Sequence, residues 1–250
     1  MTDSFYKQIS KESEAFGFSL NDLQIEQLFE YFLCLVETNK VMNLTAITEE
    51  SEVVTKHFID CMAIIKAIKP EGDTFVSSDL SGKKLIDVGT GAGFPGLVLK
   101  IMFPDLDVTL TDSLMKRLKF LDQVIEKLDL KKITTIHGRA EDLGHQKGLR
   151  ESFDFVTSRA VANLSTLSEY DLPFVKKGGF FVAYKSTGIK DEIDSAQHAI
   201  EKLGGKVVSD TEFVLPDTDI QRSIILIQKI KETPKQFPRK AGTPSKDPIV

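Results

Sequence analysis

The 250-residue chain has little cysteine and no long apolar run. Its two cysteines, Cys34 and Cys61, form no CxxC pair, and both lie in apolar, helix-like surroundings. Small buried side chains therefore explain them better than a metal site or a disulfide bond does. We expect no bound metal, and a reducing, cytoplasmic location suits this cysteine usage.

No apolar run approaches the length that spans a bilayer, and the first residues have neither a basic nor an apolar signal-peptide region. We therefore expect no membrane association. Hydrophobic residues make up 41% and charged residues 28%, as in an ordinary globular protein that can bury a full core. No apolar surface stripe is left over, so a monomer is expected.

The charge is unevenly distributed. The formal net charge of −5 does not by itself indicate a nucleic-acid binder. Six basic residues nevertheless occur from Lys229 onward, opposed only by Glu232 and Asp247. The four prolines from Pro234 to Pro248 predict a tail that is neither regular helix nor strand.

Three parts are expected along the chain. Residues 1–72 form an N-terminal helical region, because apolar residues recur at helical spacing over 21–39 and a further helix is predicted over 49–69, before Pro70. Ser19 and Asp22 resemble a capping signal for the first of these helices. Residues 73–231 form the core, and residues 232–250 form a basic tail that packs on or near it.

The core alternates between strands and helices. Strands are predicted at 84–88, 107–111, 133–136, 153–157, 180–184, 206–209 and 223–228, with helices at 96–103 and 114–128. This alternation predicts an α/β fold with a Rossmann-like, doubly wound and mainly parallel sheet. Its ligand site is expected at the carboxyl ends of the first strands.

A glycine-rich loop follows the first of these strands and leads into a helix. The segment Asp87-Val-Gly-Thr-Gly-Ala-Gly93 places glycines at alternate positions, and Gly91–Gly96 also matches the dinucleotide pattern GxGxxG. A pyrophosphate would be repelled by Asp87, whereas a cofactor with an ammonium and a sulfonium would suit it. The loop therefore favours S-adenosylmethionine and includes Gly89 and Gly91 as contacts.

Two further acids follow the next strands. Asp112 ends the second strand and could accept the ribose hydroxyls of either cofactor. Glu141, after the third strand, could accept the adenine amino group. Each acid alone would be interpreted as a solvated loop residue. Only together, at the ends of successive strands, do they support a nucleoside cofactor.

Several segments together resemble one family. They are the glycine loop, Asn43–Ile47, His57–Asp60, Asp112–Arg117, Arg139–Glu141, Ser158–Ala160 and Pro238–Lys246. They resemble the RsmG family, also called glucose-inhibited division protein B, which comprises bacterial 16S ribosomal RNA guanine-N7 methyltransferases. The resemblance covers about residues 20–250; Phe237, Ala241 and Cys61 depart from the usual pattern, outside the cofactor loop.

The resemblance implies a class I methyltransferase fold and transfer of a methyl group from S-adenosylmethionine to a guanine N7 of 16S ribosomal RNA. The partner would be 16S ribosomal RNA or the small ribosomal subunit. The implied cofactor contacts are Gly89, Phe94, Ala140, Glu141 and Arg159. Arg159 could hold the cofactor carboxylate or an RNA phosphate.

Residues of the basic tail are candidates for RNA contacts. Arg239, Lys240 and Lys246 could bind phosphates, and the resemblance favours this over an ordinary solvated charge cluster. His57 and Asp60 share one helical face. We interpret them as a hydrogen-bonded pair that holds the helical region to the sheet, with an RNA or cofactor contact as the alternative.

No catalytic base is expected. Guanine N7 carries no proton, so in-line positioning can supply much of the acceleration. Consistently, Ser158–Leu164 replaces the Asn/Asp-Pro-Pro-Tyr of amino-directed methyltransferases, and no cysteine follows a strand.

Three other functions are left open by the residues. A nicotinamide-dependent oxidoreductase shares the loop and the ribose acid, but an obvious His or Tyr-Lys constellation is missing. A methyltransferase of a small molecule or protein, and a non-catalytic RNA-binding protein, also remain.

Overall fold

The computed structural model describes residues 1–68 and 80–250. The predicted boundary between residues 72 and 73 and the predicted helix end before Pro70 lie outside the described residues. The N-terminal helical region comprises α1 (Asp3–Phe16), α2 (Asp22–Met42), α3 (Glu50–Val53), the π-helix η1 (Val54–Ile59), α4 (Asp60–Met62) and α5 (Ile64–Ile68). The helix predicted over 49–69 is therefore interrupted by a π-helical stretch. Such stretches often occur at functional sites.

Asn21, not Ser19, caps the long helix α2. The Asn21 side chain accepts a hydrogen bond from the Gln24 backbone N–H, and the Gln24 side chain accepts one from the Asn21 N–H. The Gln24 amide also donates to the carbonyls of Ile101 and Met102 at the end of α6. This capping box therefore fastens the N-terminal helices to the core.

The core contains a seven-stranded sheet. The strands are β1 (Lys84–Val88), β2 (Asp107–Asp112), β3 (Ile133–His137), β4 (Phe153–Arg159), β5 (Val175–Ser186), β6 (Gly205–Val214) and β7 (Gln221–Lys229). Their order is β3-β2-β1-β4-β5-β7-β6, and the first five strands in sequence are parallel. β7 runs antiparallel to both of its neighbours. The prediction of a mainly parallel, doubly wound α/β sheet is confirmed.

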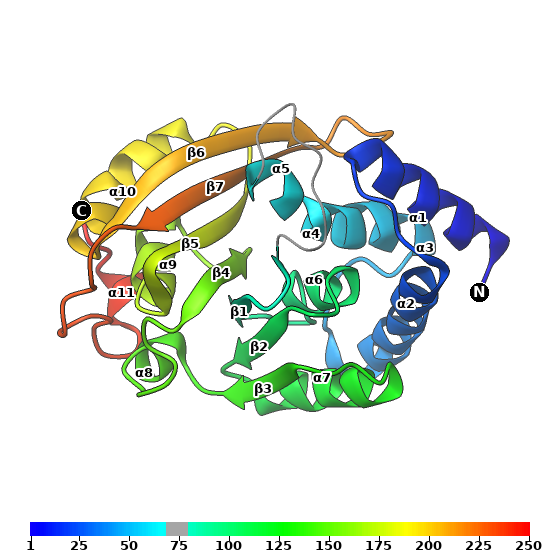
Figure 1. Ribbon diagram of the computed structural model, residues 1–250, viewed down its shortest axis with the longest axis horizontal. Coiled ribbons are helices and arrows are strands. Elements are labelled where there is room, and N and C mark those ends of the chain that lie inside the picture. The colour runs from blue at the N-terminus through cyan, green and yellow to red at the C-terminus, as the bar shows by residue number, and fades with distance from the viewer. Residues whose placement is uncertain (69–79) are drawn as a thin grey trace.

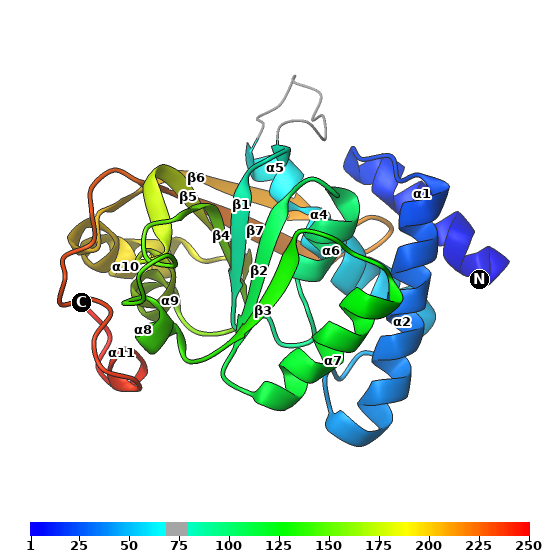
Figure 2. The same ribbon diagram turned by 60° about the horizontal axis from the view of Figure 1, so that its bottom comes forward.

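Two helical layers cover the sheet (Figure 1). The remaining helices are α6 (Gly96–Met102), α7 (Met115–Lys127), α8 (Ala140–Leu143), α9 (Leu164–Asp171), α10 (Lys190–Lys202) and α11 (Thr243–Lys246). Figure 2 shows α2, α6 and α7 on one side of the sheet and α8, α9 and α10 on the other. One hydrophobic cluster joins the N-terminal helices to α6, α7 and the sheet, and a second joins α9, α10 and the tail to the opposite face.

The tail is ordered against the second layer. Phe237 and Ile249 are buried in the cluster formed with α9 and α10. The expectation that the tail contains no regular structure is wrong at one point, because Thr243–Lys246 forms the single turn α11, with proline in its first turn. Among the described residues, no helix combines the length and apolar composition needed to cross a membrane.

Candidate functional site

The glycine loop lies between β1 and α6, at the carboxyl edge of the parallel strands. Asp87 is fully buried beneath it and accepts hydrogen bonds from Thr90 Oγ1 at 2.6 Å, the Gly96 N–H at 3.0 Å and Thr157 Oγ1 at 2.9 Å. Burial raises the pKa of the Asp87 carboxyl, while these donors counteract the rise. Asp87 thus organises the loop internally, rather than offering an open carboxylate to a cationic cofactor as the sequence suggested.

The glycines of the loop serve two different purposes. Gly89 and Gly91 have positive φ angles of +70° and +60°, which favour glycine. Gly96 is required for close packing, because an added Cβ would lie 2.5 Å from Leu110 Cδ2 and 2.8 Å from Asp87 Cβ. Tyr31 of α2 donates a hydrogen bond to the Ala92 carbonyl, so the N-terminal helices support the loop from behind.

Asp112 lies where the second strand ends, as predicted. Its Oδ2 accepts the Gly91 N–H at 3.0 Å, and its Oδ1 accepts the Leu114 N–H at 2.8 Å. Arg117 approaches Oδ2 at 3.2 Å. A carboxylate has about four acceptor positions, so Oδ1 can still accept a hydroxyl from a ligand.

A cavity of about 170 Å³ brings several predicted residues together. Its walls are formed by Val88, Gly89, Thr111, Asp112, Ser113, Gly138, Arg139, Ala140, Glu141, Val161 and Tyr170. Four of the predicted cofactor contacts (Gly89, Asp112, Ala140 and Glu141) therefore share one cavity. Glu141 is only 6% exposed, and its Oε1 accepts the backbone N–H of Gly242 at 2.7 Å.

A second cavity, of about 470 Å³, contains Arg159. Its walls are formed by Ile47, Lys56, His57, Asp60, Arg159, Ala160, Ala162, Tyr184, Lys185, Ser186, Phe213, Arg222 and Ser223. The chain from Arg159 to Ala162 separates it from the first cavity, with Val161 facing Gly89. Its four lysine and arginine side chains give this cavity a predominantly basic wall.

Arg159 links the sheet to the N-terminal helices. It donates to Asp60 Oδ2 at 2.8 Å, to His57 Nδ1 at 3.1 Å and to the Lys56 carbonyl at 3.4 Å. These bonds use three of its five N–H groups. The guanidinium also lies 5.0 Å from the centre of the Phe94 ring. Phe94 and Arg159 therefore meet, although neither lines the 170 Å³ cavity.

Both ring nitrogens of His57 have partners within the protein. Nδ1 lies 3.1 Å from Arg159 Nη2 and 3.1 Å from the Lys56 carbonyl oxygen, and Nε2 lies 2.9 Å from Thr45 Oγ1. The ring stacks on Phe94 with centroids 4.5 Å apart. Asp60 in turn contacts Arg159 and, at 3.3 Å, Arg222. His57 and Asp60 do not bond each other; each joins the helical region to the sheet through Arg159.

His57 is expected to make stability depend on pH. Burial, together with the nearby Arg159, lowers the pKa of His57 from 6.5 to about 3. Between pH 6.5 and 3 the His57 side chain is therefore protonated in the unfolded chain and neutral in the folded protein. Its contribution should lower the free energy of unfolding by about 1 kcal/mol for each unit by which the pH is lowered. Chemical denaturation from pH 7 to pH 4.5 should show a smaller decline for His57→Gln than for the wild type.

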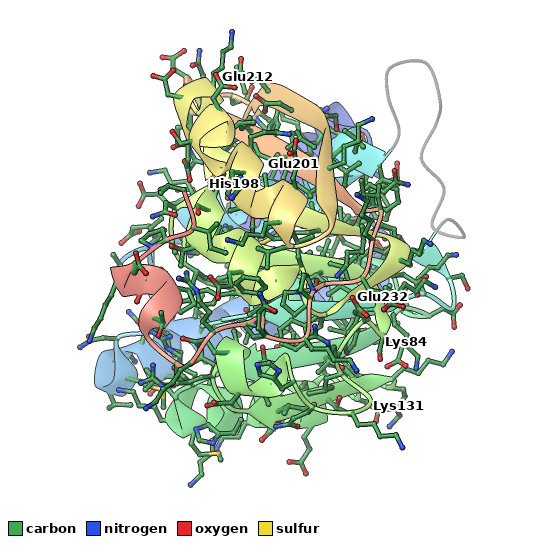
Figure 3. All side chains as sticks on the ribbon, turned by 90° about the vertical axis from the view of Figure 1, so that its left-hand side faces the viewer. Lys84, Lys131, His198, Glu201, Glu212 and Glu232 are labelled. Atoms are coloured by element: carbon green, nitrogen blue, oxygen red, sulfur yellow. The ribbon has the colours of Figure 1, made fainter. Side chains whose placement is uncertain are left out.

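An exposed histidine supplies the control for this measurement. His198 lies on the surface of α10 (Figure 3), so His198→Gln should retain the pH dependence of the wild type. Equal pH dependence in His57→Gln and the wild type would contradict the neutral state assigned to His57.

The three predicted RNA contacts of the tail have different surroundings. Arg239 pairs with Glu169, with 2.7 Å between Nη2 and Oε2, and Nη2 also donates to the Asp247 carbonyl at 2.7 Å. Lys240 and Lys246 are exposed on either side of Gly242. Arg239 therefore anchors the tail, whereas the two lysines are accessible to a phosphate backbone.

Several site residues were not found from the sequence. Tyr31 supports the glycine loop, Val161 and Tyr170 line the smaller cavity, and Arg222 and Lys185 line the larger one. Val161 directly follows Ser158–Ala160 at the end of β4, and this position could have identified it. No local pattern marks the others. Within residues 1–68 and 80–250, no cluster of three or more His, Cys, Asp or Glu side chains could hold a metal ion.

Comparisons with known proteins agree with this geometry. The family model described as rRNA small subunit methyltransferase G matches residues 24–224. A protein of Lachnoclostridium phytofermentans named Ribosomal RNA small subunit methyltransferase G is 49% identical over 94% of this chain and 93% of its own length. Another of that name, from Lactobacillus johnsonii, is 50% identical over 96% of this chain and 98% of its own. A crystal structure of a mutant of MtNAS shares the fold, with a TM-score of 0.51 and 14% identity over 92% of this chain and 78% of that one.

The strand order, the glycine loop and the acids at successive strand ends define a class I methyltransferase. The helices before β1 are an addition to that fold. With the family model matching most of the chain and relatives about half identical over almost all of it, the chain belongs to the rRNA small subunit methyltransferase G family.

Proposed function

We propose that this protein transfers the methyl group of S-adenosylmethionine to N7 of a guanine in 16S ribosomal RNA. The observation that carries this function is the near-complete match to relatives named Ribosomal RNA small subunit methyltransferase G. The two adjoining cavities, one with acids at strand ends and one with basic walls, support it.

The residues of the smaller cavity fit the adenosine part of the cofactor. Gly89 leaves one wall of this cavity without a side chain, Asp112 has an acceptor for a ribose hydroxyl, and Glu141 has an acceptor for the adenine amino group. Gly91 does not line the cavity and acts through its N–H, which Asp112 accepts. When bound, the cofactor supplies an electrophilic methyl group on a sulfonium. Phe94 and Arg159 lie on the side of the larger cavity. Two of the five N–H groups of Arg159 make no hydrogen bond to the described residues and can bind a carboxylate or phosphate.

The larger cavity is the proposed site for the target nucleotide. Lys56, Arg159, Lys185 and Arg222 surround it, which suits the phosphates beside a nucleotide turned out of the RNA. Guanine N7 is already a lone-pair nucleophile, so the side chains are needed for position and not for proton removal. Consistent with this role, His57 is neutral and both of its ring nitrogens are engaged within the protein.

A methyl-transfer assay tests the function. Unmodified 16S ribosomal RNA, naked or in assembled 30S particles, is incubated with methyl-labelled S-adenosylmethionine, and N7-methylguanine is located by cleavage at the modified base. We expect one labelled guanine. Label on another atom would contradict the N7 assignment, and transfer to neither substrate would contradict RNA methylation.

Lys240 and Lys246 are the proposed RNA contacts of the tail. The double variant Lys240→Ala/Lys246→Ala should weaken binding of 16S ribosomal RNA and reduce the slope of log affinity against log salt by about 1.5, because two phosphate contacts are lost. Filter binding over a salt series measures both quantities. The exposed pair Lys131→Ala/Lys176→Ala, at the amino ends of β3 and β5, is the control and should leave the slope unchanged. An unchanged slope in the tail variant would remove these lysines from the RNA site.

We further propose that the protein acts in the cytoplasm as a monomer. Its substrate is ribosomal, and the cofactor and nucleotide cavities are both formed within one chain. Light scattering of the purified protein measures its oligomeric state.

A further inference from the structure

The tail crosses the molecule from one edge of the sheet to the other. Figure 3 shows Lys84 and Lys131, which lie at the amino edge of the parallel strands, on the same side as Glu232. The chain then passes over the α8–α9 layer and reaches α11 on the opposite side (Figure 3). It ends beside the carboxyl edge, where the proposed cofactor cavity opens.

A chain of contacts holds the tail on this path. Arg150 donates to the carbonyls of Thr233 and Phe237, each at 2.8 Å. The Arg239–Glu169 ion pair follows, with Glu169 only 1% exposed. Thr166 Oγ1 then donates to the Pro244 carbonyl at 3.1 Å. These bonds set the position of the segment between Arg239 and Lys246.

That segment touches two walls of the smaller cavity from outside. The Gly242 N–H donates to Glu141 Oε1 at 2.7 Å, and Gly242 does not itself line the cavity. The Ser245 side chain also interacts with Tyr170, another lining residue. The tail therefore contacts the acid and the aromatic ring from positions outside the proposed cofactor site.

We propose that Gly242 is a positioning residue for recognition of the adenine amino group. Its N–H occupies one acceptor direction of Glu141 and orients the carboxylate, so that the remaining acceptors face the cavity. This inference rests on the proposed function and adds to it a role for the tail that is separate from RNA binding. A buried carboxylate without this donor would have to find another partner, and its preferred orientation would change.

The two roles of the tail are thereby coupled. Lys240 and Lys246 flank Gly242, so RNA bound by these lysines would further stabilise the position of the segment that orients Glu141. Linkage then requires that RNA strengthen cofactor binding by the same factor by which the cofactor strengthens RNA binding.

Selectivity between two ligands provides the test. S-adenosylhomocysteine carries the adenine amino group, and S-inosylhomocysteine has an oxygen in its place. Titration calorimetry gives both dissociation constants for the full-length wild type, Gly242→Pro and Gly242→Asn. Proline removes the N–H and cannot adopt the φ of +81°, so it also displaces this part of the tail. Asparagine keeps the N–H, tolerates the φ of +81° and has open space for its Cβ.

We expect the wild type to prefer S-adenosylhomocysteine by about tenfold or more, the effect of one lost hydrogen bond with an unpaired buried partner. Gly242→Pro should bind the two ligands within about threefold of each other. Gly242→Asn should retain the preference of the wild type. Added 16S ribosomal RNA should strengthen S-adenosylhomocysteine binding in the wild type and not in Gly242→Pro.

The inference and the proposed function fail in different ways. If Gly242→Pro keeps the selectivity of the wild type, the positioning role is overturned while the function stands. If the wild type binds neither ligand, the proposed function itself is overturned. Should Gly242→Pro not fold by its thermal melt, Thr166→Val/Ser245→Ala loosens the same segment, and unchanged selectivity in that variant overturns the positioning role.

Discussion

Gly89→Asp is expected to weaken S-adenosylmethionine binding by about 100-fold or more, a loss of about 3 kcal/mol. Gly89 has a φ of +70°, and an added Cβ would lie 3.1 Å from Val161 Cγ2. An aspartate side chain would extend further into the junction where Val161 faces the loop between the two cavities. Backbone strain and crowding both act to weaken binding.

Titration calorimetry measures this loss. Gly148→Asp is the matched control, because Gly148 also has a positive φ, of +93°, but is exposed with nothing within 4 Å of an added Cβ. The control should bind the cofactor like the wild type. Wild-type affinity in Gly89→Asp would mean that the cofactor does not pass over the glycine loop.

Arg239→Ala is expected to lower the free energy of unfolding by about 3 kcal/mol, the effect of leaving a buried charge without its partner. Glu169 is 1% exposed, and the backbone N–H, Nε and Nη2 of Arg239 all donate to its two oxygens. Removing the guanidinium therefore leaves a buried carboxylate with one backbone donor. Urea denaturation of the full chain measures the change.

Two variants separate the ion pair from the positive charge of the tail. Lys240→Ala removes an exposed neighbouring charge and should change stability by less than about 0.5 kcal/mol. Glu169→Leu/Arg239→Met removes both partners and should be more stable than Arg239→Ala. A stable Arg239→Ala variant with weakened RNA binding would contradict the anchoring role and return Arg239 to the RNA contacts.

Most of the sheet could be predicted because its strands are local apolar segments. The five parallel strands were found, with β5 beginning earlier than expected because Val175 already pairs with Phe153, before the irregularity that contains the turn at Lys177–Gly179. β6 extends to Val214, well beyond the predicted residue 209, since its outer residues are exposed and polar and interrupt the apolar pattern. The π-helix η1 was missed because an extra residue per turn leaves the apolar composition unchanged.

The site was predictable where its residues follow strand ends. Gly89, Asp112 and Glu141 share a cavity because parallel strands bring their carboxyl ends to one edge. The partners of charged side chains were not predictable. Arg239 reads as a free cation in the sequence, and only the fold places Glu169, 70 residues earlier, against it. The same holds for Arg159 with Asp60, and for Asp87, whose three donors come from the loop and from β4.

The path of the tail also bears on the order in which the protein becomes active during its synthesis. Gly242 follows Gly89, Asp112 and Glu141 in the chain. The ribosome therefore synthesises the sheet and the lining of the smaller cavity before the segment that contacts Glu141. N-terminal parts fold first as a chain emerges. A nascent chain can therefore fold its Rossmann-like core while Glu141 still lacks its Gly242 donor and Glu169 still lacks its arginine. The enzyme is complete only after this late segment has left the ribosome, the particle whose RNA it is proposed to methylate.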